Sequence, residues 1–228
     1  MIVMLVLASA GHVVYDNARK VWKKYMNCNP NVKVYMVYGA ITNLEDQDEH
    51  DLVYQDIREC YNPGMLLKTI RAMEYIDKHE KYDYFVRTNI STFWDFEKLL
   101  EHIKILPPTL CYSGDGPFAG RYLSGTDTIV TPEMIKEIIK AKDTLDYGCC
   151  EDDALGRFFN GVLGAPFLPN RICFLIHFHD PDDPNILIHI EQGIKSNCDH
   201  YRVKNHHRDI VDLAVYKCLL LRIYNITF

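Results

Sequence analysis

Apolar and polar positions along the chain fall into blocks that predict strands and helices in turn. Residues 2–9, IVMLVLAS, are apolar up to the final serine, which is typical of a strand buried on both faces of a sheet. Residues 15–26 place Ala18, Val21, Trp22 and Tyr25 on one side of a helix. A second apolar strand is expected over 32–39, and the acidic stretch after it, 41–51, is expected to be a solvated loop.

The alternation continues through the first half of the chain. We expect strands over 52–57 and 82–88, and helices over 62–79 and 93–105. Alternating strands and helices predict an α/β fold with a mixed, mainly parallel central sheet flanked by helices on both faces. Ligand sites in such sheets lie at the carboxyl ends of the strands.

The second half changes character. Residues 109–114 and 121–131 are expected to be strands added to the sheet in antiparallel orientation. Helices are expected over 132–142, 149–163 and 209–224, and a late strand over 171–180. We expect one domain over 1–228, which can itself be one module of a longer protein.

Composition narrows the class of protein. The net charge of −6 disfavours a general nucleic-acid binder, which usually carries a basic excess. The apolar run at the start covers only about seven residues and lacks a basic flank, so we interpret it as a strand and not as a signal peptide. No stretch approaches the roughly 20 apolar residues of a membrane span. We therefore expect a cytoplasmic protein.

Three clusters of side chains could carry chemistry. Glu151, Asp152 and Asp153 open a predicted helix, where they either cap the helix dipole or supply a general base. His177 and His179 share one face of a predicted strand and either bind a metal ion or are ordinary strand residues.

The third cluster is the basic segment 200–208. Arg202 and Lys204 either grip a phosphate or lie on a solvated basic face.

Several short motifs occur in an order that resembles a known family. They are LVLAS with NARKVW, then DIRECYNPGMLLKTIRAMEYI, YFVRTNISTF, YLSGTDTIVTPEMI and CEDDALG. Together they resemble the GT-A-fold nucleotide-sugar glycosyltransferases of the β-1,3-galactosyl- and N-acetylglucosaminyltransferase type. The chain is also similar to the cytosolic glycosyltransferases of large DNA viruses, such as the chlorella viruses.

The resemblance implies a glycosyltransferase that uses a UDP-sugar donor and a glycan or glycoprotein acceptor. It places Asn89-Ile90-Ser91 where the family has an acidic metal-binding triplet, and both acids are missing. Mn²⁺ or Mg²⁺ dependence is therefore open, because these cations prefer carboxylate oxygens. If a metal is present, we expect its ligands among Asn89, Ser91, His177 and His179. Otherwise basic residues must face the diphosphate.

The resemblance also implies roles for individual residues. Asp152 matches the catalytic base, with Glu151 and Asp153 beside it. The acceptor side is expected to contain Tyr122, Ser124, Gly125 and Thr126. The residues expected to bind the nucleotide sugar are Ala8, Ser9, Arg19, Asp56, Lys68, Arg87, Asn89, Ser91, Arg202 and Lys204.

The viral relatives of this type glycosylate capsid proteins, which implies work in the host-cell cytoplasm. Two other functions stay open at this point. The first is a catalytically inactive module that binds a sugar nucleotide, suggested by the missing acids. The second is a metal-dependent hydrolase centred on His177 and His179.

Overall fold

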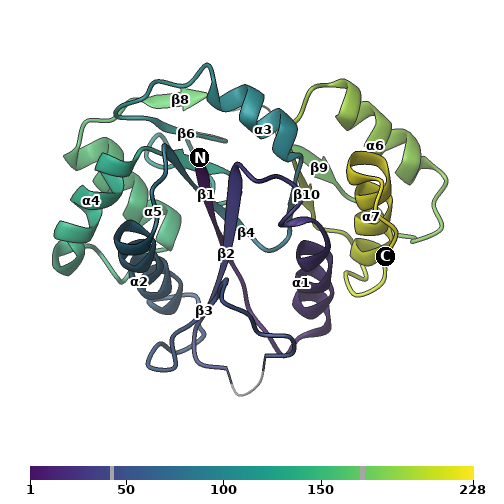
Figure 1. Ribbon diagram of the computed structural model, residues 1–228, viewed down its shortest axis with the longest axis horizontal. Coiled ribbons are helices and arrows are strands. Elements are labelled where there is room, and N and C mark those ends of the chain that lie inside the picture. Colours follow the sequence, from purple (N-terminus) through teal and green to yellow (C-terminus); the bar gives the residue numbers. More distant parts are fainter. Residues whose placement is uncertain (42–43, 170–172) are drawn as a thin grey trace.

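A seven-stranded sheet runs through the middle of the molecule (Figure 1). The computed structural model describes residues 1–41, 44–169 and 173–228. In spatial order the strands are β3 (Asp51–Val53), β2 (Val32–Tyr38), β1 (Ile2–Leu7), β4 (Tyr84–Asn89), β7 (Thr128–Val130), β6 (Tyr112–Gly114) and β8 (Phe167–Pro169). Neighbouring strands among β3, β2, β1 and β4 are parallel, whereas β7 is antiparallel to both β4 and β6.

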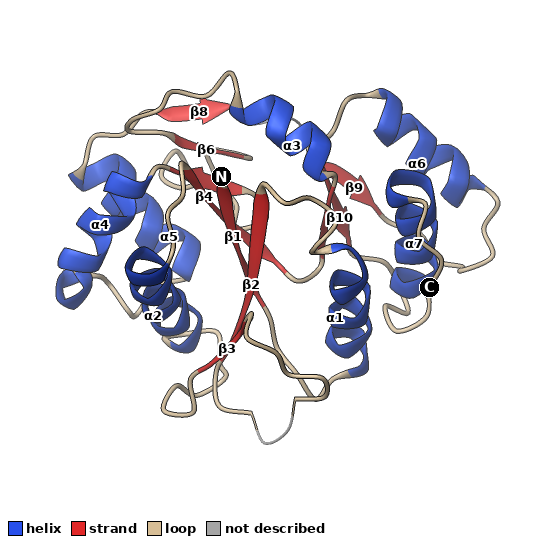
Figure 2. Cartoon of the chain, viewed as in Figure 1, coloured by secondary structure: helices blue, strands red, loops and turns tan. Residues whose placement is uncertain are grey.

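Helices cover both faces of this sheet (Figure 2). One face shares a core with α1 (Val13–Tyr25), α3 (Phe96–Ile103), α6 (Asn185–Lys195) and α7 (Val211–Leu219). The other face packs against α2 (Gly64–His79), α4 (Pro132–Lys140) and α5 (Glu151–Gly156). Shorter helical turns occupy Lys142–Thr144, Arg157–Val162 and Leu220–Tyr224. Among the described residues, no helix has the length and apolar character to cross a membrane.

The large sheet has a hydrophobic core on each face, and the apolar sequence of β1 explains why both are needed. Met4 and Val6 of β1 point into the core with α1, and Val3 and Leu5 point into the core with α2. Successive side chains of a strand point to opposite faces, so a strand that is apolar throughout must be covered on both sides. All six residues of β1 are buried.

A second, three-stranded sheet lies beside the carboxyl end of β4. It contains β5 (Thr92–Trp94), β10 (His200–Val203) and β9 (Phe174–Ile176). The central strand β10 is antiparallel to β5 and parallel to β9. The amide of Val203 donates to the carbonyl of Ser91 at 3.0 Å. This pairing brings the segment after β10 next to the end of β4.

The order of the strands creates a crevice between β1 and β4. From β1 the chain moves outward through α1 to β2 and then to β3, and α2 carries it back to β4 on the other side of β1. Leu7 at the end of β1 is in register with Asn89 at the end of β4. Open α/β sheets bind ligands at such a point, outside the carboxyl ends of the strands where the strand order reverses.

The predicted α/β class, with a mainly parallel sheet flanked by helices, is confirmed. Several element boundaries differ from the sequence prediction. The predicted helix over 93–105 begins as strand β5, since Phe93 and Trp94 pair with β10. The predicted strand over 52–57 ends at Val53, and helix α6 and strand β10 were not predicted. Within the predicted loop 41–51 and strand 171–180, residues 42–43 and 171–172 lie outside the described part.

A buried charged cluster fastens the two sheets to each other. Asp199, just before β10, lies 2.9 Å from Nδ1 of His102 on α3 and 2.6 Å from Nδ1 of His200. Nε2 of His200 lies 3.5 Å from Asp127, which precedes β7. Burial alone would raise the pKa of Asp199, but the two histidines lower it well below its usual range. Burial opposes protonation of His200 as well, yet Asp127 and Asp199 raise its pKa.

We expect Asp199→Asn to lower the free energy of unfolding by about 3 kcal/mol near pH 6, because removing one partner leaves buried charge uncompensated. Asp199 stabilises the fold above about pH 4, and this contribution is lost as pH falls towards its lowered pKa. His200 contributes fully to the free energy of unfolding below about pH 6.5, and this contribution is lost as pH rises through its raised pKa.

Denaturant titrations from pH 3 to pH 8 measure this difference. We expect the gap between wild type and Asp199→Asn to be widest near pH 5 to 6 and to shrink below about pH 4. Asp143→Asn, at an exposed aspartate, is the matched control. An Asp199→Asn variant as stable as wild type at pH 6 would show that the cluster does not hold the two sheets.

Candidate functional site

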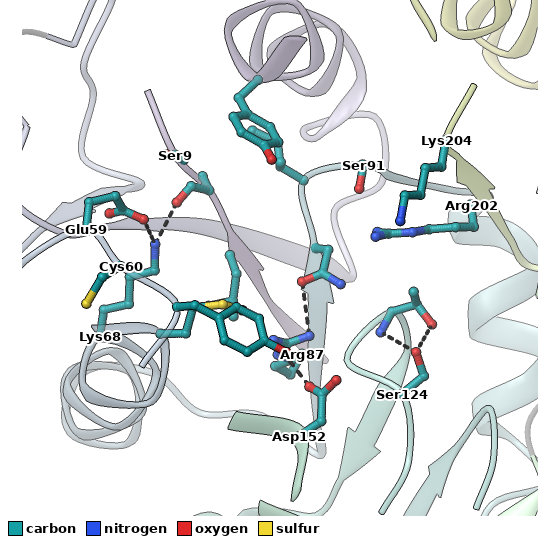
Figure 3. A pocket seen from close by; sticks show the side chains of 18 residues that line it. Ser9, Glu59, Cys60, Lys68, Arg87, Ser91, Ser124, Asp152, Arg202 and Lys204 are labelled. Atoms are coloured by element: carbon teal, nitrogen blue, oxygen red, sulfur yellow. Dashed lines mark hydrogen bonds and ion pairs between the residues drawn. The ribbon is translucent and has the colours of Figure 1, made fainter. Parts of the chain in front are cut away.

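A cavity of about 690 Å³ opens at the crevice between β1 and β4. Residues from the ends of both strands line it, together with residues of α1, α2, α5 and the segment after β10 (Figure 3). Eleven of the residues selected from the sequence line this cavity: Ala8, Ser9, Lys68, Arg87, Asn89, Ser91, Ser124, Thr126, Asp152, Arg202 and Lys204. Residues more than 100 positions apart in the sequence therefore meet around one space.

Arg87 of β4 is the central side chain of the cavity floor. Its guanidinium is fully buried and forms a two-point ion pair with Glu151 of α5, with Nε 3.0 Å from Oε1 and Nη2 bonded to Oε2. Nη1 donates to the carbonyl of Gly125 and, at 3.1 Å, to Oδ1 of Asn89. Arg87 therefore fixes three neighbouring segments and has little capacity left to bind a ligand.

Glu151 lies behind Arg87, outside the set of residues that line the cavity. It also accepts a hydrogen bond from Oγ1 of Thr69 at 3.0 Å. Burial raises the pKa of Glu151 to about 7, although Arg87 opposes the rise. These contacts make Glu151 a residue that positions Arg87.

The two aspartates after Glu151 face different surroundings. Asp152 lines the cavity, with a 30% exposed side chain whose Oδ1 is 3.5 Å from Nη2 of Arg87. Asp153 is outside the cavity lining and accepts a hydrogen bond from Arg157 at 2.6 Å, and the charged group of Arg121 lies 3.6 Å from it. Of the three adjacent acids, only Asp152 is placed to meet a ligand.

Lys68 of α2 reaches the end of β1 but already has partners. Its ammonium group donates to the carbonyl of Ala8 at 2.8 Å and forms an ion pair with Glu59. Burial lowers its pKa, and the charge of Glu59 opposes that shift. Lys68 thus holds the rim of β1 in place and contributes little free positive charge.

Arg202 and Lys204 differ from the other two cations of the cavity. They extend from the end of β10 towards the same side of the cavity (Figure 3). Within residues 1–41, 44–169 and 173–228, neither side chain forms an ion pair with a carboxylate. Arg202 makes a 3.4 Å contact with Oγ1 of Thr92, and burial lowers its pKa. An anionic ligand would supply the charge that this pair of cations lacks.

The residues at the end of β4 do not fit a hard divalent cation. Asn89 and Ser91 offer a neutral amide and a hydroxyl, where Mn²⁺ or Mg²⁺ would prefer carboxylates. Oδ1 of Asn89 already accepts a hydrogen bond from Arg87. With Arg87 paired to Glu151 and Lys68 paired to Glu59, Arg202 and Lys204 face one further carboxylate of the lining, Asp152. The remaining positive charge repels a cation.

The remaining residues selected from the sequence lie elsewhere. Arg19 is paired with Asp51 at 2.8 Å and borders a separate hollow. Asp56 is exposed and paired with Arg71 at 3.2 Å. Tyr122, expected on the acceptor side, packs against Gly156 and is outside the cavity lining.

His177 and His179 are exposed and do not line the cavity. The four residues expected as metal ligands are thus divided, because Asn89 and Ser91 line the cavity and the two histidines do not. Likewise Asp152 lines the cavity without them, so the two groups that a hydrolase would combine are not both part of it.

Seven residues of the cavity lining were not selected from the sequence, and Glu59, Tyr15 and Tyr61 are among them. Glu59 is the partner of Lys68, and Tyr15 and Tyr61 contribute aromatic rings to the lining. The available signal was weak, since Glu59 and Tyr61 lie in an irregular stretch without periodicity. Tyr15 lies one helical turn before Arg19 on α1. The residue selected from this helix, Arg19, is therefore one turn away from the residue that lines the cavity.

Comparison with known proteins identifies the fold. No protein-family model matches the sequence, and no curated protein matches it. A solved structure of a glycosyltransferase involved in glycosylation of the major capsid of PBCV-1 aligns with a TM-score of 0.54 at 8% identity, covering 94% of this chain and 98% of that chain. The fold is therefore GT-A-like, as the sequence resemblance predicted.

Two structures of the galactosyltransferase LgtC align less well. One, in complex with donor and acceptor sugar analogues, gives a TM-score of 0.42 at 13% identity. The other, an active-site mutant of LgtC, gives a TM-score of 0.43 at 10% identity. Each alignment covers 89% of this chain and 86% of the LgtC chain.

Gly125 provides a test of the Arg87 arrangement. A Cβ added there would collide with the guanidinium of Arg87 and with Oδ1 of Asp152. We expect Gly125→Ala to displace one or both groups and to lower the free energy of unfolding by about 1–3 kcal/mol, as overpacking of a filled site does.

Thermal and denaturant unfolding measure this loss. Gly161→Ala is the matched control, because a Cβ at Gly161 meets nothing within 4 Å. If Gly125→Ala were as stable as the control, Arg87 and Asp152 would not be packed against Gly125 as described.

Proposed function

We propose that this chain is a glycosyltransferase that moves a sugar from a UDP-sugar to a hydroxyl group of a glycan or glycoprotein. The observation that carries the proposal is the pair of cations in the cavity between β1 and β4, Arg202 and Lys204. Among the described residues, neither cation forms an ion pair with a carboxylate. A nucleoside diphosphate is negative when bound and gains charge as it leaves, so it requires a positive partner in both states. The GT-A-like fold supports this proposal.

The proposed donor lies along the ends of β1 and β4. Its diphosphate faces Arg202 and Lys204, and Ser9, Asn89 and Ser91 offer hydrogen bonds to its ribose and phosphate oxygens. Each of these side chains lines the cavity, and Ser91 lies directly beside β10 through the Val203 amide. The arrangement binds the diphosphate by charge-assisted hydrogen bonds.

Asp152 is the proposed general base. Its carboxylate accepts the proton of the acceptor hydroxyl, and the oxygen attacks the anomeric carbon from the face opposite the nucleotide. The bond from the anomeric carbon to the phosphate oxygen breaks, and the diphosphate leaves with the electron pair. Arg202 and Lys204 stabilise the charge that develops on it. A single displacement of this kind inverts the configuration of the anomeric carbon.

The proposed reaction does not use a divalent cation at Asn89 and Ser91. This follows from the neutral donor set and from the surplus of basic side chains in the cavity.

The acceptor approaches from the loop that precedes β7, where Ser124 and Thr126 line the cavity. Oγ of Ser124 and Oγ1 of Thr126 lie 2.9 Å apart and form a small polar patch. We propose a glycan of a viral capsid protein as acceptor, with transfer taking place in the host-cell cytoplasm. Support for this acceptor comes from the sequence resemblance and from the capsid glycosyltransferase that shares the fold.

UDP binding tests the two-cation site. We expect calorimetry in EDTA to show binding that Mn²⁺ does not strengthen. Arg202→Gln and Lys204→Gln should each weaken it about tenfold or more, because each removes a hydrogen bond from a charged group, worth about 1.5–3 kcal/mol.

Lys24→Gln, at an exposed lysine of α1, is the control and should bind UDP as wild type does. Binding only with Mn²⁺ would show that a cation is held by substitute ligands. The absence of binding in both conditions would contradict the proposed function.

Asp152→Asn tests the base. We expect turnover of a UDP-sugar to fall by about 10²–10⁴-fold while UDP affinity stays unchanged, since general base catalysis contributes on this order. Asp153→Asn is the matched control, because it removes the neighbouring carboxylate, which is outside the cavity lining.

Two outcomes would contradict this assignment. Equal loss of turnover in both variants would show that neither aspartate is specific to the reaction. A wild-type chain that binds UDP-sugars yet neither transfers nor hydrolyses them would be an inactive binding module.

A further inference from the structure

Three histidines meet on the surface beyond the ends of β9 and β10. His177 and His179 follow β9, and His206 follows β10. The parallel register pairs Ile176 with Val203. The backbone bonds continue beyond the strands, because the amide of Lys204 donates to Ile176 at 3.3 Å and the amide of His206 donates to Phe178 at 3.1 Å. Continued pairing places His206 opposite His179, while His177 lies on the same face two residues earlier.

The imidazole rings are already grouped. The rings of His179 and His206 stack with centroids 4.0 Å apart, and His177 lies 4.9 Å from His206 and 5.7 Å from His179. One nitrogen of each ring lies within 4.8 Å of the others, and all three residues are exposed. Backbone hydrogen bonds hold the chain on both sides, so small side-chain rotations suffice to bring the nitrogens to one point.

One ring has its proton position fixed. Nδ1 of His177 lies 2.7 Å from the carbonyl oxygen of Lys204. A carbonyl only accepts, so Nδ1 carries the proton and Nε2 keeps its lone pair. Protein metal sites use this arrangement regularly: the second ring nitrogen donates to a carbonyl and thereby orients the ligand.

We propose that His177, His179 and His206 form a binding site for a transition metal ion of the Zn²⁺ type. Neutral imidazole suits Zn²⁺, Cu²⁺ and Ni²⁺, whereas Mg²⁺ and Mn²⁺ favour oxygen ligands. Three histidines leave the fourth tetrahedral position for water or an incoming group. The site is separate from the nucleotide-sugar cavity, since none of the three residues lines it.

Metal binding at this site would affect the wall of the cavity through Lys204. The carbonyl of Lys204 accepts from His177, and its side chain lines the cavity. A metal ion that joins the segments after β9 and β10 therefore also fixes the backbone from which Lys204 extends. The expected effect is a stiffer cavity wall, without direct contact between the metal and the donor.

The test is titration of the full chain, free of any histidine tag, with Zn²⁺ and separately with Mg²⁺. We expect one Zn²⁺ per chain, a raised thermal midpoint and no binding of Mg²⁺. His179→Asn and His206→Asn should each weaken Zn²⁺ binding at least about tenfold, which is the loss produced even by removing an outer partner of a ligand. Circular dichroism checks that both variants are folded.

His207→Asn is the matched control, because His207 is adjacent, exposed and outside the triad, and asparagine tolerates its positive φ. Unchanged Zn²⁺ affinity in His179→Asn and His206→Asn would overturn the site, as would equal losses in the control.

Hydrogen exchange tests the coupling. Zn²⁺ should slow exchange of the amides of Lys204 and His206, which bond to the β9 segment. Slower exchange in wild type but not in His206→Asn supports the connection to the cavity wall. Unchanged exchange at Lys204 with Zn²⁺ bound would overturn it.

Discussion

The buried pair between Arg87 and Glu151 is the constraint on which the site depends. It joins β4 to the first turn of α5 across 64 positions of sequence, and both side chains are about 1% exposed. Two charges in such a place are stable only when both are paired, since removing one partner typically costs about 3–5 kcal/mol. The pair therefore fixes α5 against the sheet. The position of Asp152, one residue further along the helix, follows from it.

The same pair determines which cations are left for a ligand. Arg87 is occupied by Glu151 and by the carbonyl of Gly125, and Lys68 is occupied by Glu59 and the end of β1. The positive charge left for a ligand therefore comes from Arg202 and Lys204, which the three-stranded sheet places at the cavity. The large sheet provides the rigid crevice, and the small sheet provides the charge that makes the crevice suitable for an anion.

The sheet and much of the cavity lining could be predicted from the sequence. The residues that were placed differently have physical reasons for it. The apolar run of β1 and the alternation after it predicted the sheet and its carboxyl ends, so Ser9 and Asn89 were found. Helix periodicity did not decide which acid faces the cavity, because neighbouring residues on a helix point in directions about 100° apart. The motif resemblance selected Asp152, and Asp152 is the acid that lines the cavity. Asp56 was selected through the resemblance and lay at the end of a strand predicted to run to 57, whereas β3 ends at Val53.

The neutral side chains of Asn89 and Ser91 and the two cations at the end of β10, Arg202 and Lys204, belong to one electrostatic arrangement. A carboxylate at position 89 would meet Nη1 of Arg87, as the amide oxygen does at 3.1 Å, and would add a second negative charge to the guanidinium that Glu151 already neutralises through Nε and Nη2. The amide instead accepts from Arg87 without adding charge, so the Arg87–Glu151 pair stays balanced. A neutral β4 end has no charge to hold a metal ion, so in the proposed function the diphosphate of the donor needs other positive partners. Arg202 and Lys204, which line the same cavity, are the residues proposed for that role.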